Sequence, residues 1–298
     1  MLDRESTFAY PETVQLLKSK FIPVAIDQAY QRRQNDAEGE FYREIAGQSP
    51  RNNFKGTTQG FFAASASGKL YFYNNNRDEK KLTRLLKQAL EAHVPERNVA
   101  AIKRGKLEAR YNPVPPEGGL VLRVHARIPG GYEPTENRWK KIFQSAVSRD
   151  NFWITGEEHQ ALAQGRLPEK LQRRMVRFHF VDNTRGEPPM WKDDEIKEID
   201  LEFDGKVISG TVRLKTKDGT RGYDAKVRGE IETRDGKITS FDLVAHGRFW
   251  GDGPYTKNPP EGKFPLAVSM TLADGTDVAD RIPPQGSRGW VPGYLELR

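Results

Sequence analysis

Cysteine is absent from this chain of 298 residues. Without a thiol, the chain can form no disulfide, no thiolate zinc site, no iron–sulfur cluster and no cysteine nucleophile. Long apolar runs are absent as well, since stretches such as Phe61–Ala64 and Leu120–Leu122 fall far short of the roughly 20 residues that cross a bilayer. The sequence therefore excludes thiol chemistry and predicts no membrane span.

The first residues, MLDRESTFAY, lack a basic stretch followed by an apolar one, so they predict no secretory signal peptide. A cytoplasmic location is then the default expectation, provided that Met1 is the native start. The absence of cysteine does not decide the compartment, because a cysteine-free protein is tolerated in oxidising and reducing surroundings alike.

The composition is that of a folded protein with a basic balance. Hydrophobic residues make up 36% of the chain, which excludes a mainly disordered protein. The net charge is +7, and the largest positive excess lies in residues 96–190. Acids nevertheless alternate with bases throughout, and no basic run resembles a nucleic-acid-binding tail. This pattern favours a solvated surface of mixed charge and disfavours nucleic acid as a partner.

The first third of the chain alternates helical patterns with short apolar runs. Pro11 suits the first position of a helix, and Phe21–Ile26 has the β-branched residues of a buried strand. In chain order the sequence predicts a helix over 10–20, a strand over Phe21–Ile26, helical structure over 28–46, a hairpin of Gly60–Ala64 with Lys69–Tyr73, and a helix capped by Asp78.

The pattern changes after residue 95. Leu120–Ile128 alternates apolar and polar residues, which predicts a half-buried strand, and residues 136–174 predict two helices, the second starting at a capping box of Thr155 and Glu158. Asp-Gly pairs then separate a run of predicted strands, which implies an antiparallel meander that closes into a barrel or a sandwich. The predicted strands are Met175–Val181, Ile196–Phe203, Lys206–Thr216, Arg221–Thr233, Lys237–Phe249, Lys263–Leu272 and Val291–Leu297.

A set of spaced motifs in the first third points to a known family. They are Asp3-Arg4-Glu5-Ser6-Thr7-Phe8, Pro11-Glu12-Thr13-Val14, Phe21-Ile22-Pro23-Val24 and Asp27, followed by Gly56–Tyr73. Together they resemble the thioredoxin-like superfamily, most closely the bacterial branch in which a redox C-x-x-C precedes such a segment. The resemblance covers roughly residues 1–92. It implies a thioredoxin-like α/β domain.

Two departures from the family pattern bear on activity. The alignment puts the redox cysteines and the first strand upstream of Met1. It also puts Gln59, after Thr58, where thioredoxins have a cis-proline, and a residue other than proline prefers the trans peptide by about 2.5–4 kcal/mol. The resemblance therefore implies an altered docking edge at Thr58 and Gln59. The missing strand implies an incomplete sheet edge through which two copies could pair.

One C-terminal segment combines glycines, aromatic rings and an arginine, a composition suited to a close-approaching loop. It could line the mouth of a barrel and hold an aromatic or anionic ligand, or its rings could close the end of the core. The segment is His246–Tyr255, and Arg221-Gly222-Tyr223 would join it. The candidate binding residues are Arg221, Tyr223, His246, Arg248, Trp250 and Tyr255. No two of the five histidines lie within five positions of each other, and we predict no metal site, no cofactor and no catalytic residue.

Taken together, the sequence predicts an α+β protein of two domains: a thioredoxin-like α/β domain over 1–95 that lacks its first strand, and an antiparallel β barrel or sandwich over 175–298. Residues 96–174 would connect them with a strand and a helix pair. The predicted function is a redox-inactive thioredoxin-like module that binds or scaffolds an unidentified protein or small molecule.

Two alternatives stay open. One is an N-terminally truncated thiol–disulfide oxidoreductase whose C-x-x-C lies upstream of Met1. The other is a ligand carrier or hydrolase with its site in the β domain, which a deep pocket lined by His179, Arg221, Tyr223 and Trp250 would favour. Enzyme activity is therefore left open, except that the chain cannot carry dithiol chemistry.

Overall fold

The computed structural model describes residues 5–97, 99, 105–106 and 108–297. The chain divides into a small unit that ends at Pro113 and a large unit that begins at Val114. The protein is α+β, with helices and a large antiparallel sheet.

The small unit consists of short helices and one hairpin. Its elements are η1 (Thr7–Ala9), α2 (Pro11–Lys20), α3 (Gln28–Gln31), α4 (Ala37–Gly47), β1 (Phe61–Ala64), β2 (Leu70–Asn74) and α5 (Glu79–Ala92). The predicted hairpin is confirmed, because β1 and β2 pair antiparallel. The cap of α5 is confirmed too: the Asp78 carboxylate accepts a hydrogen bond of 2.9 Å from the Lys81 amide.

Helical structure over 28–46 is confirmed only in part, because the chain leaves the helix between α3 and α4. Asp36 causes the restart: its backbone is extended, and its carboxylate accepts the Gly39 amide at 3.1 Å as the cap of α4.

The predicted strand over Phe21–Ile26 is wrong. The segment forms no strand, and Ile22 and Val24 are 91% and 71% exposed. The apolar run satisfied the pattern of a buried strand, but a strand also needs a partner, and β1 and β2 pair only with each other in a two-stranded sheet. Pro23 also lacks the N–H that a ladder requires.

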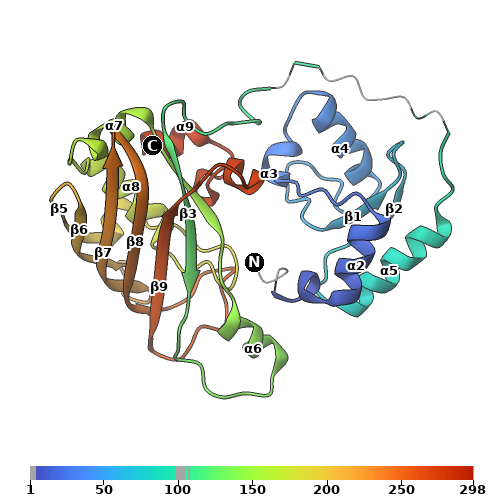
Figure 1. Ribbon diagram of the computed structural model, residues 1–298. Helices are drawn as coiled ribbons and strands as arrows, with labels where there is room; N and C mark the ends of the chain where they lie inside the picture. Colours follow the sequence, from blue (N-terminus) through green and yellow to red (C-terminus); the bar gives the residue numbers. More distant parts are fainter. Residues whose placement is uncertain (1–4, 98, 100–104, 107, 298) are drawn as a thin grey trace. The chain divides into compact units, whose positions relative to one another are not determined.

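The large unit is built on one antiparallel sheet of seven strands, here called the large sheet (Figure 1). Its spatial order is β4-β3-β9-β8-β7-β6-β5. The strands are β3 (Leu120–Arg127), β4 (Asp150–Ile154), β5 (Ile196–Phe203), β6 (Val207–Lys215), β7 (Gly222–Arg234), β8 (Lys237–Trp250) and β9 (Lys263–Leu272). The meander from β5 to β9 is confirmed, but the sheet has two edges, and the described residues form no closed barrel.

Three Asp-Gly pairs make the hairpin turns of this meander. Gly205, Gly219 and Gly236 have φ angles of 93°, 74° and 70°, which glycine adopts without the strain of a side chain. The fourth predicted turn, Asp274-Gly275, does not join two strands. It follows β9 and leads into the 3-10 helix η3 (Val278–Arg281).

Two predicted strands are helices, and one strand was missed. The helices of the large unit are α6 (Arg138–Ser145), α7 (Gly156–Ala163), α8 (Glu169–His179) and α9 (Val291–Glu296), with the 3-10 helices η2 (Asp193–Glu195) and η4 (Gln285–Ser287). Met175–Val181 belongs largely to α8, because Leu171 and Met175 are spaced for one buried helix face. In α9, Val291 and Tyr294 are spaced in the same way. The missed strand is β4, which follows the first of the two predicted helices.

Alternation along the strands separates a buried face of the large sheet from a solvent face. In β7, Tyr223, Ala225 and Val227 are buried and the residues between them are not. The helices α7 and α8 cover the buried face (Figure 1). The capping box that starts α7 is confirmed at Thr155 and Glu158.

Candidate anion-binding face

The two candidates of the small unit are part of its packing. Thr58 is fully buried, and its Oγ1 lies 2.6 Å from the hydroxyl of Tyr42 and 3.2 Å from Gln28 Oε1. Gln59 is exposed, and its carbonyl accepts a hydrogen bond of 2.8 Å from the Tyr73 hydroxyl. Thr58 therefore holds α3, α4 and the loop before β1 together.

Arg221 lies in the core of the large unit. Its guanidinium is stacked 3.9 Å from the ring centroid of Trp191, donates to the Pro189 carbonyl at 2.5 Å, and lies 3.6 Å from a Glu195 carboxylate oxygen. Burial lowers the pKa of Arg221 to about 10, and the Glu195 carboxylate opposes that effect. The side chain remains charged at neutral pH, and these internal contacts use its hydrogen-bond donors and its charge.

Tyr223 is likewise a core residue. Its side chain is fully buried, and its hydroxyl donates to the carbonyls of Ala245 and Leu266, both at 3.0 Å. Burial raises the pKa of the Tyr223 hydroxyl. Arg221 and Tyr223 thus form no part of an open ligand site.

A buried array of acid, imidazole and phenol lies elsewhere in the large unit. His179 Nδ1 is 3.3 Å from Asp150 Oδ2, and His179 Nε2 is 2.7 Å from the Tyr294 hydroxyl. Such an array can move protons when a substrate reaches it. Here the His179 side chain is 0% exposed and Tyr294 is 2% exposed. Burial raises the pKa of Tyr294 well above its ordinary value. The array therefore joins β4, α8 and α9.

A buried ion pair extends this internal network. Arg174, which is fully buried on α8, donates two hydrogen bonds of 2.7 and 2.5 Å to the carboxylate of Glu158. The bonds from Arg174 hold the pKa of Glu158 below its ordinary value, against the opposing effect of burial. Both charges are thereby neutralised inside the unit.

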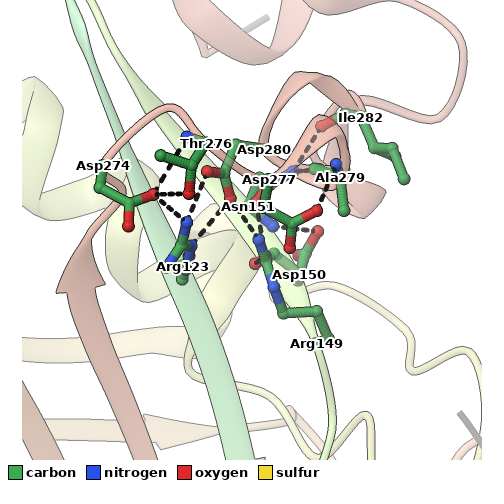
Figure 2. Close-up of polar contacts among 10 residues, drawn as sticks. All are labelled: Arg123, Arg149, Asp150, Asn151, Asp274, Thr276, Asp277, Ala279, Asp280 and Ile282. Carbon is green, nitrogen blue, oxygen red and sulfur yellow. Dashed lines mark hydrogen bonds and ion pairs between the residues drawn. The ribbon is translucent and has the colours of Figure 1, made fainter.

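Two arginines bracket one aspartate beside β3, as Figure 2 shows. Arg123 reaches both carboxylate oxygens of Asp280 at 2.9 and 2.8 Å, and Arg149 reaches Oδ1 at 2.7 Å. Arg123 also contacts Asp274 at 2.6 Å. Hydrogen bonds from Arg123 hold the pKa of Asp280 below its ordinary value. These two cations are thus fully occupied.

Asn151 completes the attachment of the same segment (Figure 2). Its amide nitrogen donates to the carbonyls of Ala279 and Ile282 at 2.7 and 2.8 Å. The Asp150 carboxylate accepts the backbone amide of Gln285 at 2.9 Å. The network fixes residues 274–285 to β3 and β4, and its polar groups serve that attachment.

Basic side chains of a different kind lie on the solvent face of the large sheet. In β7, Lys226 and Arg228 are exposed between buried neighbours, and in β8 His246 and Arg248 are exposed on either side of the half-buried Gly247. Arg127 is exposed at the end of β3. We call these five residues the basic face.

The register of the strands gathers the basic face. His246 pairs with Lys226 on one side and with Ala267 on the other, and Ala267 pairs with Arg127. Since neighbouring strands lie about 4.8 Å apart, this row of four residues spans roughly 15 Å. Within the described part of the chain, Arg127, Lys226, Arg228 and Arg248 form no ion pair, so their charges are available to a partner.

Acidic residues and compensated pairs bound this face. Asp242 of β8 pairs in register with Glu230 of β7, which places two exposed acids beyond Arg228. At the other end of the face, Asp224 of β7 pairs in register with Arg248 and forms an ion pair of 3.3 Å with Lys263. The unpaired positive charge is therefore confined to a small area of β3, β8 and β7.

Trp250 lies at the margin of the face and has its own contacts. Its ring nitrogen donates to the Gly219 carbonyl at 3.0 Å, and Lys263 lies 4.1 Å from the ring centroid. The ring also packs on Gly222, where a Cβ atom would lie 2.1 Å from it. Tyr255 is 74% exposed in the loop after β8.

Sequence reasoning found part of this face. His246 and Arg248 were among the predicted binding residues, and the structure places both on it. It brings Arg221 and Tyr223 to the core instead and leaves Thr58 and Gln59 in the small unit. Arg127, Lys226 and Arg228 were missed as binding residues, although the polar positions of alternating strands were the signal that could have found them.

Metal binding and membrane insertion find no support in the part of the chain that the structure describes. Its His, Asp and Glu side chains form no group of three or more that could hold a metal ion. None of its helices combines the length and the apolar character needed to traverse a bilayer. Compared with protein-family models, curated proteins and solved structures, the chain matches none of them.

Proposed function

We propose that this protein is a redox-inactive binding module whose basic face holds an anionic partner. The observation that carries the proposal is the group of exposed arginine and lysine side chains that strand register gathers on β3, β8 and β7. Arg127, Lys226, Arg228 and Arg248 form no ion pair among the residues that the structure describes. A partner that supplies negative charge would relieve the mutual repulsion of these cations and gain attraction to each of them.

The remaining polar clusters support binding over catalysis. The acid, imidazole and phenol of Asp150, His179 and Tyr294 are buried and contact one another. The residues proposed to line a ligand pocket, Arg221 and Tyr223, have internal partners of their own. The hydrolase and carrier alternatives thus lose the residues on which they depended.

Elementary electrostatics limits the strength of such binding. Exposed ion pairs contribute roughly 0.2–1 kcal/mol each, so the face would give a weak, reversible association. Salt screens exposed charges over a Debye length of about 10 Å at 0.1 M ionic strength, so the affinity should fall as salt is added.

The likeness of residues 1–92 to the thioredoxin-like superfamily also stays a proposal. It rests on the sequence motifs of residues 3–27 and 56–73, and the order of α2, the β1–β2 hairpin and α5 is compatible with it, whereas Phe21–Ile26 forms no strand. The binding function proposed here does not depend on it, because the basic face lies entirely in the large unit.

A polyanion titration tests the proposed function. Binding of a short labelled oligo-L-glutamate is measured by fluorescence anisotropy at low and high salt for the full chain and two triple variants. R127E/K226E/R248E reverses the basic face, whereas K217E/R234E/K237E reverses as many exposed charges at the β6–β7 and β7–β8 turns. We expect at least a tenfold loss for the first variant and less than a twofold change for the second. Equal losses in both variants, or no binding by the native chain, would contradict the proposal.

A further inference from the structure

The inference below rests on the proposed function and names the partner's class. We infer that the basic face takes a short acidic polypeptide segment in extended conformation, lying along β9 between β3 and β8. On the side of this segment that faces the sheet, positions i and i+2 carry carboxylates and position i+4 carries an apolar side chain.

The side chains on the solvent face of β9 are short where those of its neighbours are long. Ala267 lies in register between Arg127 of β3 and His246 of β8. Ser269 is the next residue of β9 on the same face. Since β3 and β8 are two strand spacings apart, about 9.6 Å, Arg127 of β3 lies on one side of a strip one extended chain wide, and His246 and Arg248 of β8 lie on the other.

The spacing along β8 sets the positions of the carboxylates. His246 and Arg248 are two residues apart on one strand, which separates them by about 6.7 Å. An extended peptide repeats its side chains on one face with the same period. A peptide with acids at positions i and i+2 can therefore make two contacts at the same time. One acid lies near Arg127 and His246, which flank Ala267, and the other lies near Arg248, two residues further along β8.

The third position on that face of β8 is apolar. Val244 follows His246 in the alternation and is 44% exposed, with Arg228 of β7 beside it in register. A partner's apolar side chain two positions from its acids would cover Val244 and remove that surface from water. A peptide offers this combination of charge and apolar contact.

The same surface suits other anions less well. Single-stranded nucleic acid gains much of its affinity by stacking bases on aromatic rings. The ring of Trp250 already contacts Lys263 and packs against Gly222. A longer polyanion or a lipid surface would extend over the acids Asp242 and Glu230 that bound the face.

Four probes of known chemistry separate these occupants. They are a labelled peptide with glutamates at i and i+2 and valine at i+4, a peptide of the same composition with adjacent glutamates, a twelve-nucleotide oligothymidylate, and vesicles containing phosphatidylserine. The full-length chain should bind the alternating peptide at least fivefold more tightly than the adjacent-acid peptide, because adjacent acids face opposite sides of an extended chain. It should also prefer that peptide to the oligonucleotide and the vesicles.

A charge exchange identifies the contacts. The variant H246E/R248E should no longer bind the alternating peptide and should bind a peptide in which lysines replace the two glutamates. V244S should lose the preference for valine over serine at i+4 and keep the preference for alternating acids. As in the earlier titration, K217E/R234E/K237E is the matched control.

The outcomes distinguish the inference from the function beneath it. If the oligonucleotide or the vesicles bind more tightly than the alternating peptide, and R127E/K226E/R248E abolishes that binding, the inference of a peptide partner is wrong and the proposed anion-binding function is retained. Equal binding of the two peptides would overturn the extended register. Self-association that H246E/R248E abolishes would make a second copy of this chain the occupant. Binding of every probe that no variant on the face reduces would overturn both proposals.

Discussion

The Nε2 atom of His179 lies 2.7 Å from the hydroxyl oxygen of Tyr294, although 115 residues separate the two in sequence. The contact joins α8 to α9 inside the large unit, where both side chains are buried. On its other ring nitrogen, His179 contacts Asp150 of β4 at 3.3 Å. The imidazole of His179 thus links β4, α8 and α9, which are distant from one another in sequence.

Replacing Tyr294 by phenylalanine should therefore destabilise the large unit. The substitution keeps the ring and leaves His179 Nε2 buried without its partner, which costs about 1–3 kcal/mol. Urea unfolding followed by tryptophan fluorescence measures the effect. Tyr255→Phe, at a side chain 74% exposed, is the control and should stay within about 0.5 kcal/mol of the native chain. Equal midpoints for the two variants would contradict a structural role for the hydroxyl.

The pH dependence of stability should report the carboxylate of Asp280. Its pKa in the folded state is held down by Arg123, below the value of about 3.9 for an unfolded aspartate. The carboxylate thus stabilises the fold fully above the unfolded value and loses that effect as the pH falls through the lowered folded value.

Asp280→Asn should consequently cost about 2 kcal/mol or more at pH 7, since it leaves two arginines without their shared counter-charge. The difference from the native chain should narrow between pH 5 and pH 2. Guanidinium midpoints measured across that range test the claim, with Asp235→Asn at an exposed turn as the control. A gap that stays constant down to pH 2 would show that Asp280 does not titrate in this way.

Arg221 should not tolerate lysine. The planar guanidinium stacks on Trp191 at 3.9 Å, and an ammonium group cannot reproduce that contact together with the bond to Pro189. We expect Arg221→Lys to cost about 1–2 kcal/mol in chemical unfolding. Arg213→Lys, where the side chain is 61% exposed, should change the midpoint little. A smaller effect at Arg221 than at Arg213 would refute the packing argument.

The exposed segment of the small unit should accept polar residues. Ile22 and Val24 are largely in water, so Ile22→Ser and Val24→Ser should each change stability by less than about 0.5 kcal/mol. Leu86→Ala in α5, at a residue 4% exposed, should cost about 2–5 kcal/mol. Hydrogen exchange adds a second readout, because the amides of 22–26 should exchange faster than those of β1 and β2. Strong protection of 22–26 would restore the strand that the sequence predicted.

The chain should show no dithiol reductase activity. It contains no cysteine, and thiol–disulfide exchange needs an attacking thiolate. In an insulin-reduction assay with dithiothreitol, the protein should give the rate of the reductant alone. Any clear acceleration would exclude this account of the chain.

Local patterns predicted the structure well wherever local physics decides it. The β5–β9 meander follows from alternation and Asp-Gly turns, and the caps at Asp78 and Thr155 follow from side chains that bond nearby amides. Phe21–Ile26 failed because burial of a strand depends on a distant partner. Met175–Val181 failed because a short apolar run fits a helix face as well as a strand.

The candidate site was predictable only in part for a related reason. His246 and Arg248 stand near each other in sequence, so a linear pattern could select them. Arg127 joins them only through the pairing of β3 with β9 and of β9 with β8. The alternation of residues along one strand does not reveal the order of the strands in the sheet. That order decides which charged residues become neighbours.

The attachment of residues 274–285 to β3 and β4 has a consequence for synthesis on the ribosome. Arg123 meets Asp280 across 157 residues, so β3 emerges long before its counter-charge and before its partner β9. Until then, one edge of β3 has no partner strand, and Arg123 and Arg149 lack the carboxylate of Asp280. Chaperones and proteases that act on emerging chains would therefore meet β3 as a strand paired on one side only, and a chain that stalls before residue 280 would lack the ion pairs that Asp280 forms with Arg123 and Arg149.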